Sequence, residues 1–314
     1  MSNPRPQLGD LLGAQRGLLA QRFYHSRQAV RSINSRLQTL PDFHPMHPEE
    51  LLPKPRPAIG WAGGKQRLLK HILPEIPAHT TYCEVFGGGL AVFLARPQSP
   101  VEVINDINSE LIGFYRCCKY HLDPLLDELD LVMNSREEFE DYRRQPGLTD
   151  IQRAARWYIR NRISFGGMGA TFAVCRKHAL TGRTQRMQVL RALSHRMEKT
   201  TIEHVSWERC LDLYDAPETF FFLDPPYLDG AGDAYSGWSE VDLARFCERV
   251  AKLEGQWIFT FQDCPQVRSA MAGWPIKAIT RANGIGNNGA KRSGRVYREV
   301  VITSGERAAA RKVA

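Results

Sequence analysis

The stretch that decides the fold is FFFLDPPY, residues Phe220–Tyr227. Four large apolar residues run directly into a carboxylate, two prolines and an aromatic ring. A short apolar run bounded by turn residues predicts a strand that is buried on both faces. Asp224 then stands where this strand leaves the sheet, and ligands of open α/β sheets bind at that edge.

The two prolines define what this edge offers to a ligand. Pro225 and Pro226 lack backbone N–H donors, and a following proline keeps the preceding residue out of the α region. The carbonyls of Asp224 and Pro225 therefore stay free of a helical ladder, beside the Asp224 carboxylate and the Tyr227 ring. Such a group of acceptors suits a planar ring with an exocyclic amine, as in a nucleobase. A proline turn with a solvated Asp224 is the alternative, which the preceding buried strand makes the weaker interpretation.

Strand-like runs alternate with helix-like runs from Ala58 onward. This alternation predicts the α/β class, with a mostly parallel sheet and helices on both faces. The expected strands are Tyr82–Phe86, Glu102–Asn105, Thr201–Val205, Thr219–Leu223, Gln256–Phe261, Ile276–Thr280 and Val296–Thr303.

Two intervals break this rhythm. Between Leu111 and Lys199 the pattern is helical without a βα repeat, which predicts an inserted, mainly helical subdomain over residues 115–199. The sheet domain then comprises residues 58–114 and 200–314. Leu8–Leu40 has apolar residues and arginines at helical spacing, and Pro41–Pro57 holds six prolines. Residues 1–57 are therefore expected to form basic helices and a linker.

Composition narrows the class of protein. The net charge of +8 and the pI of about 9.2 favour a polyanionic partner. Seven cysteines without a C-x-x-C pair predict free thiols in a reducing cytoplasm. Neither a metal site nor a signal peptide nor a membrane span is expected. The oligomeric state is not set by the sequence.

A glycine turn precedes the second predicted strand. YCEVFGGGLAVF (82–93) indicates a strand, a turn and the start of a helix, and Asp106 lies 18 residues beyond Gly88. An acid at that place commonly accepts hydrogen bonds from ribose hydroxyls, which predicts a nucleoside-containing cofactor. The pattern G-x-G-x-x-G is absent, which argues against nicotinamide and flavin dinucleotides. A tight turn without a ligand is the alternative for the glycines.

Four motifs taken in order resemble the Dam-type family of S-adenosylmethionine-dependent DNA adenine-N6 methyltransferases. They are GWAGGK (60–65), EVFGGG (84–89), INDINSELI (104–112) and LDPPY (223–227). The segment NRISFGGMGATFA (161–173) resembles a loop of the same enzymes. The resemblance extends from Ile59 to Thr303 and implies a Rossmann-like methyltransferase sheet with an inserted target-recognition subdomain. It also implies a cytoplasmic protein of a bacterial cell, or one that a phage or prophage encodes. The family pattern F-x-G-x-G would place a glycine at Leu90, so the turn here is made by Gly87, Gly88 and Gly89.

The resemblance implies roles for individual residues. The residues expected to enclose the methionine end of S-adenosylmethionine are Trp61, Gly63, Gly64 and Lys65. Those expected to line its passage across the sheet edge and to bind its ribose are Phe86, Gly87, Gly88 and Asp106. Those expected to hold a flipped adenine from double-stranded DNA are Asp224, Pro225 and Tyr227.

Basic residues dominate the predicted insertion, where Glu198 is the only acid between Arg153 and Lys199. This imbalance predicts phosphate contacts. The residues are Arg153, Arg156, Arg160, Arg162, Arg176, Lys177, Arg183, Arg186, Arg191, Arg196 and Lys199. A second basic loop, GIGNNGAKRSGR (284–295), adds Lys291 and Arg292 as candidates.

Three other functions fit part of the same pattern. The Asp224 carboxylate and the neighbouring carbonyls also suit the N4 amine of cytosine. The positive net charge is also compatible with an RNA substrate. A DNA-binding protein that keeps the fold without the reaction is a further alternative, against which the intact Asp224 and Tyr227 argue. The recognition sequence and a restriction partner are beyond what the sequence reveals.

Overall fold

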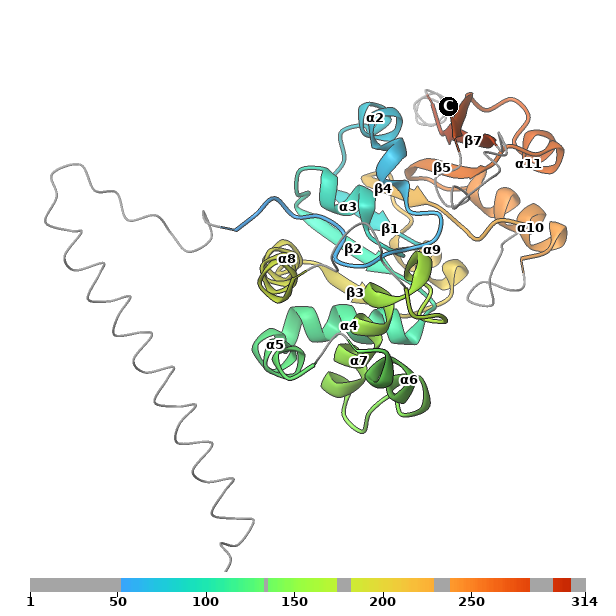
Figure 1. Ribbon diagram of the computed structural model, residues 1–314. Coiled ribbons are helices and arrows are strands. Elements are labelled where there is room, and N and C mark those ends of the chain that lie inside the picture. The colour runs from blue at the N-terminus through green and yellow to red at the C-terminus, as the bar shows by residue number, and fades with distance from the viewer. Residues whose placement is uncertain (1–51, 133–134, 174–181, 229–237, 283–295, 306–314) are drawn as a thin grey trace, which may run out of the picture. The chain divides into compact units, whose positions relative to one another are not determined.

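The computed structural model describes residues 52–132, 135–173, 182–228, 238–282 and 296–305 (Figure 1). The chain divides into two units, Met1–Leu52 and Pro53–Ala314, and the fold described here is that of the second. The basic helices expected between Leu8 and Leu40 lie outside the described residues.

A seven-stranded sheet forms the centre of this unit. The strands are β1 (Thr81–Glu84), β2 (Val101–Asn105), β3 (Thr201–Glu203), β4 (Thr219–Leu223), β5 (Gln256–Gln262), β6 (Ile276–Ala282) and β7 (Val296–Thr303). Their order across the sheet is β3-β2-β1-β4-β5-β7-β6. Neighbours are parallel from β3 to β5, whereas β7 runs antiparallel to β5 and β6. The predicted mostly parallel sheet is thus confirmed, with strand ends that differ from the prediction by two residues at most.

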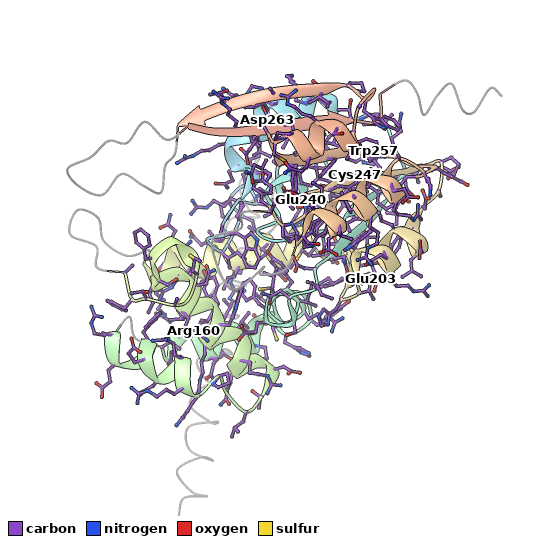
Figure 2. The ribbon with its side chains drawn as sticks, turned by 90° about the vertical axis from the view of Figure 1, so that its right-hand side faces the viewer. Arg160, Glu203, Glu240, Cys247, Trp257 and Asp263 are labelled. Atoms are coloured by element: carbon purple, nitrogen blue, oxygen red, sulfur yellow. The ribbon has the colours of Figure 1, made fainter. Side chains whose placement is uncertain are left out.

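Helices cover both faces of the sheet. One face carries η2 (Lys65–Leu68), α2 (Leu69–Ile72), η3 (Leu73–Glu75), α3 (Ala91–Ala95) and α4 (Ser109–Tyr120). The other face carries α9 (Trp207–Tyr214), α10 (Glu240–Val250) and α11 (Pro265–Ala270). Figure 2 labels Cys247 of α10 and Trp257 of β5, which belong to the core on this second face.

Strand β4 contributes to both cores, as its uninterrupted apolar run predicts. All five of its residues are buried. Phe220 and Phe222 belong to the core beneath α3 and α4, whereas Phe221 and Leu223 belong to the core beneath α9 and α10. Because successive side chains of a strand point to opposite faces, a strand at the centre of a covered sheet needs apolar residues at every position.

The interval from residue 115 to residue 199 contributes helices and no strand among its described residues. They are α5 (Leu122–Asp130), α6 (Arg136–Arg144), α7 (Asp150–Ile163), η4 (Phe165–Gly167) and α8 (Arg183–Arg196). In Figure 1, α5, α6 and α7 lie together beyond β3 and away from β7. Phe114 of α4 stacks on Tyr158 of α7 with ring centroids 5.2 Å apart. The expected boundary between residues 114 and 115 therefore falls inside α4, a helix that packs against both parts.

A buried cluster of charges ties α8 to the sheet. Glu102 of β2 pairs with Arg96 and with Arg196, and all three side chains are at most 7% exposed. Arg196 also donates to the Phe93 carbonyl at 2.9 Å and lies over the Phe93 ring. Arg196 belongs to the basic run that was expected to meet DNA phosphates, and here its guanidinium is engaged inside the protein.

Glu84 at the end of β1 gives the fold a testable dependence on pH. Its Oε2 accepts hydrogen bonds from the Tyr82 hydroxyl at 2.6 Å and from the Phe93 amide at 2.9 Å, and burial raises the pKa of Glu84 to about 8. An acid whose pKa is higher in the folded chain lowers the free energy of unfolding as pH rises from its unfolded pKa towards its folded pKa. The slope for one group is at most about 1.4 kcal/mol per pH unit.

We therefore expect Glu84→Gln to flatten the fall in stability between about pH 5 and pH 8. Urea unfolding at several pH values measures this slope. The exposed Glu218 beside β4 provides the control, and Glu218→Gln should leave the slope as it is. A slope that is the same in Glu84→Gln and in the unmodified chain would contradict the prediction.

Candidate active site

Three of the predicted motifs meet at one edge of the sheet. The glycine turn follows β1, Asp106 follows β2 and Asp224 follows β4. Strand β1 pairs in parallel with β2 on one side and with β4 on the other. The segments after these strands therefore lie side by side at the carboxyl edge, where open α/β sheets bind ligands.

Asp106 holds the glycine turn through its carboxylate. Its Oδ2 accepts from the Gly88 amide and its Oδ1 accepts from the Asn108 amide, each at 2.9 Å. Burial raises the pKa of Asp106, and these N–H donors act in the opposite direction. Each carboxylate oxygen has more than one acceptor site. Asp106 can therefore hold the turn and still accept hydrogen bonds from the hydroxyl groups of a ligand.

Leu90, which stands where the family pattern has a glycine, adopts a left-handed backbone conformation. Its φ of 56° and ψ of 33° are left-handed, and among the described residues no other non-glycine has a positive φ. Its amide donates to the Gly87 carbonyl at 2.8 Å, and its side chain is 1% exposed. This conformation costs an ordinary residue about 1–2 kcal/mol, and burial of a leucine side chain contributes about 1.5–3 kcal/mol. The turn thus keeps a glycine-type path with a leucine in it.

The loop Gly60–Lys65, called the Trp61 loop below, packs against the glycine turn. A Cβ atom on Gly88 would stand 2.5 Å from Nε1 of Trp61, and Gly88 itself has a φ of +46°. Both observations require glycine at this position. The Gly64 amide donates to the Trp61 carbonyl at 3.1 Å and closes the loop. Two of the predicted cofactor segments are therefore in contact.

Lys65 joins the Trp61 loop to residues 224–227, called the DPPY segment below. Its Nζ lies 2.6 Å from Oδ2 of Asp224 and donates to the Gly63 carbonyl at 2.8 Å. Thr260 of β5 donates to Oδ1 of Asp224 at 2.8 Å, so both carboxylate oxygens are held. Burial raises the pKa of Asp224, whereas the Lys65 ammonium and the Thr260 hydroxyl lower it. The result is a carboxylate fixed in position at the end of β4, with 19% of its side chain exposed.

Tyr227 is held by a hydrogen bond to a residue of β7. Its hydroxyl donates to Oε1 of Glu299 at 2.7 Å, and the Lys65 ammonium lies 5.2 Å from the centre of its ring. Glu299 is 1% exposed. Pro225 is buried, whereas Tyr227 is partly exposed. The DPPY segment is thus supported by buried polar groups from β5 and β7.

Sequence analysis did not single out Thr260 or Glu299. Thr260 is a single polar residue inside the apolar run WIFTF (257–261), whereas Glu299 follows Arg298 directly in the strand VYREVVIT (296–303). A single polar residue within an apolar strand is the signal that points to Thr260, since a buried polar group needs a partner, and no comparable signal marks Glu299. Only the pairing of β4 with β5 and of β5 with β7 identifies that partner.

The other predicted cofactor residues differ in their exposure to solvent. Gly63 and Gly64 are exposed, and Lys65 is buried. Phe86 packs edge-on against Phe246 and Trp238, with ring centroids 5.8 Å and 6.0 Å apart. Its ring therefore supports the turn from the side of α10.

The predicted DNA-binding residues are spread over the helical insertion. Arg153 and Arg183 are exposed and pair with Asp150 and Asp130. Arg156 donates to the Gln145 carbonyl at 2.8 Å, and Arg160 to the Gly169 carbonyl at 3.4 Å. Arg162 is half-buried and Arg186 is buried. Figure 2 shows Arg160 in the helical part, apart from Glu240 and Asp263. The predicted residues outside the described part of the chain are Arg176, Lys177, Lys291 and Arg292.

The described residues contain neither a membrane-spanning helix nor a cluster of metal-ligating side chains. No helix in this part of the chain is long and apolar enough to cross a membrane. In the same residues, no three His, Cys, Asp or Glu side chains gather as a metal site requires. The six cysteines that the structure describes are free thiols.

The strand order, the glycine turn after β1 and the acids after β2 and β4 define a Rossmann-like methyltransferase. Residues 61–253 match the family described as D12 class N6 adenine-specific DNA methyltransferase. The chain belongs to this family, and its reaction is the methylation of adenine N6 in DNA.

Relatives that are named as methyltransferases or as a DNA adenine methylase align over most of their lengths. Type II methyltransferase M1.LlaDCHI of Lactococcus lactis is 28% identical, over 79% of this chain and 95% of the relative. Type II methyltransferase M.MjaIII of Methanocaldococcus jannaschii is 22% identical, over 79% of this chain and 98% of the relative. A DNA adenine methylase of Vibrio cholerae is 24% identical, over 76% of this chain and 93% of the relative.

Proposed function

We propose that S-adenosylmethionine is the methyl donor, and that the target adenine of double-stranded DNA turns out of the helix into a pocket formed by Asp224, Pro225 and Tyr227. The observation that carries this proposal is the contact of Lys65 with Asp224 at 2.6 Å. Through it, the Trp61 loop, the glycine turn and the DPPY segment form one cluster at the carboxyl edge of the sheet.

The residues at this edge fit the chemistry of S-adenosylmethionine. Asp106 has acceptor sites left for ribose hydroxyls. Ile107 follows it directly and is 65% exposed, so it offers apolar surface to an adenine ring. Gly63 and Gly64 are exposed beside Lys65, where backbone and ammonium donors suit the carboxylate of the methionine end. When bound, S-adenosylmethionine would supply a methyl group on a positively charged sulfur.

Asp224 and the Pro225 carbonyl are the acceptors that would orient the adenine amine. The N6 lone pair of adenine is delocalised into the ring, which makes the free amine a poor nucleophile. Two hydrogen bonds from N6 to fixed acceptors would favour a tetrahedral nitrogen and aim its lone pair at the methyl group. Holding reactants in line accounts for up to about 7–11 kcal/mol of a barrier. Lys65 and Thr260 keep the Asp224 carboxylate from turning away.

The same carboxylate is suited to receive the proton that N6 loses after methylation. Burial raises the pKa of Asp224, which increases its affinity for a proton. Lys65 acts in the opposite direction and favours the ionised form that must accept the amine hydrogen bond. Asp224 therefore need not act as a strong base, because the methylated amine is itself acidic and releases its proton late.

Tyr227 would stack on the flipped base. Removing a base from a duplex costs a few kcal/mol, and an aromatic ring that stacks on it offsets part of that cost. The Tyr227 hydroxyl is held by Glu299 at 2.7 Å, so the plane of the ring is set before the base arrives. The basic residues of the insertion would contact the phosphates on either side, and the exposed Arg153 and Arg183 are the first of them to test.

One experiment tests the donor and the base together. The purified protein is incubated with S-adenosylmethionine that carries a labelled methyl group and with unmethylated double-stranded DNA, and the DNA is digested to nucleosides. We expect label in N6-methyladenine, and sequencing of the modified DNA then gives the context of each modified base. Label in N4-methylcytosine alone would reject adenine as the base that the proposed pocket holds, and no transfer from S-adenosylmethionine would reject the donor.

A further inference from the structure

One buried amide, that of Asn161, joins two loops that are distant in the sequence, one of them at Gly60, 101 residues before it. Asn161 stands near the end of α7 and is 4% exposed. Its Oδ1 accepts from the Gly60 amide at 2.8 Å, and its Nδ2 donates to the Gly60 carbonyl at 2.8 Å. Nδ2 also donates to the Gly167 carbonyl at 2.6 Å. One side chain thus binds both sides of Gly60 and the next loop at once.

The two loops also touch directly through their backbones. A Cβ atom on Gly167 would stand 2.7 Å from the carbonyl carbon of Gly60, and Gly167 has a φ of +74°. Only glycine fits this contact. The loop around Gly167, residues 164–169, is called the Phe165 loop below. Its shape is fixed by Ser164, whose hydroxyl accepts from the Gly169 amide at 2.8 Å and donates to the Asn161 carbonyl at 3.1 Å.

The loops that Asn161 joins face different ligands under the proposed function. Gly60 begins the Trp61 loop. The Trp61 ring lies against Gly88, and Lys65 of the same loop contacts Asp224. The Phe165 loop ends the arginine-bearing helix α7 and presents Phe165 and Met168, which are 52% and 51% exposed. Two exposed apolar side chains beside a basic helix are suited to the bases of distorted DNA.

We propose that Asn161 is a positioning residue that couples cofactor binding to DNA binding, because it fixes the Phe165 loop to the Trp61 loop. The inference rests on the proposed role of the Trp61 loop in holding S-adenosylmethionine. Ordering of the Trp61 loop by the cofactor is transmitted through Gly60 and Asn161 to Gly167. Such coupling is reciprocal, so DNA tightens the binding of the cofactor by the same factor.

Hydrogen exchange with the full-length protein tests the link without DNA. S-adenosylhomocysteine, which cannot donate a methyl group, is the probe. In the unmodified protein it should slow amide exchange in both loops. In Asn161→Ala it should slow exchange in the Trp61 loop alone. Protection of both loops in Asn161→Ala, or of the Trp61 loop alone in the unmodified protein, would overturn the inference. Absence of protection in the Trp61 loop of the unmodified protein would count against the proposed cofactor site instead.

Binding measurements give the second readout. The probe is an unmethylated duplex that contains a sequence in which the protein methylates adenine, as identified by sequencing. Its dissociation constant is measured with and without S-adenosylhomocysteine. Couplings between sites are typically about 5–150-fold. We expect at least about a fivefold tightening in the unmodified protein, falling to within about twofold in Asn161→Ala. An undiminished factor in Asn161→Ala would overturn the inference.

Two further variants separate coupling from stability. Asn161→Asp keeps the acceptor for the Gly60 amide and loses both donated bonds, so it should uncouple the loops as Asn161→Ala does. Thr149 caps the opposite end of α7 through its hydroxyl. Thr149→Ala should lower Tm by a few degrees and leave the coupling factor as it is. Equal loss of coupling in Thr149→Ala would show that helix stability, and not the amide link, carries the effect.

Discussion

Replacement of Asp224 by alanine is expected to reduce kcat at least about a thousandfold, because the proposed amine acceptor and proton acceptor are then lost together. Binding of S-adenosylhomocysteine should change only a few-fold, since the proposed cofactor contacts lie on Asp106 and on the loops around Trp61 and Gly88. Asp224→Asn keeps the shape of the side chain, and its amide carries donors where the adenine amine also carries donors. It should lose nearly as much activity. Single-turnover methyl transfer to duplex DNA measures the effect.

Asp263 provides a matched control for this experiment. It follows β5, the strand next to β4, and its carboxylate is already bound by Arg268 at 2.6 Å and 2.9 Å. Asp263→Ala should therefore retain activity within a few-fold. Asp224→Ala also leaves Lys65 without its carboxylate partner. Unfolding curves for all variants therefore test whether each of them is still folded. Full activity in a folded Asp224→Ala variant would remove Asp224 from the mechanism.

Among the substitutions proposed here, Glu102→Ala should lower the free energy of unfolding the most. The change would leave Arg96 and Arg196 buried without their shared carboxylate, and breaking a buried ion pair from one side costs about 3–5 kcal/mol. Both guanidiniums keep backbone partners at Pro97 and Phe93, which cannot neutralise their charge. Urea unfolding measures the change in the free energy of unfolding.

Two comparisons isolate the charge effect. The triple variant Glu102→Leu, Arg96→Met, Arg196→Met removes all three charges, and it should recover most of the lost stability, because apolar residues of similar volume replace buried ion pairs at little cost. Glu140→Ala breaks an exposed pair with Arg143, and its effect should stay within about 1 kcal/mol. A loss in Glu102→Ala no larger than that in Glu140→Ala would show that the cluster contributes little.

The basic run between Arg153 and Lys199 illustrates where sequence reasoning stops. Charge predicts that such a run avoids the core, yet Arg186 and Arg196 are buried, and Arg196 meets a carboxylate 94 residues away in the chain. Strand β4, in contrast, has the bounds that its sequence predicts, because an uninterrupted apolar run between turn residues has few other ways to be buried.

The sequence by itself determined the parallel sheet, the position of Asp224 at the end of β4 and that of Asp106 at the end of β2. These follow from local pattern, since period, turn residues and strand ends are all read within a few residues. Only the tertiary structure decided that Thr260 and Glu299 support the DPPY segment and that Asn161 holds Gly60 against Gly167. Each of these contacts joins strands or loops distant in the chain, and a buried polar group acquires its partner from the packing of those elements, not from its neighbours in sequence.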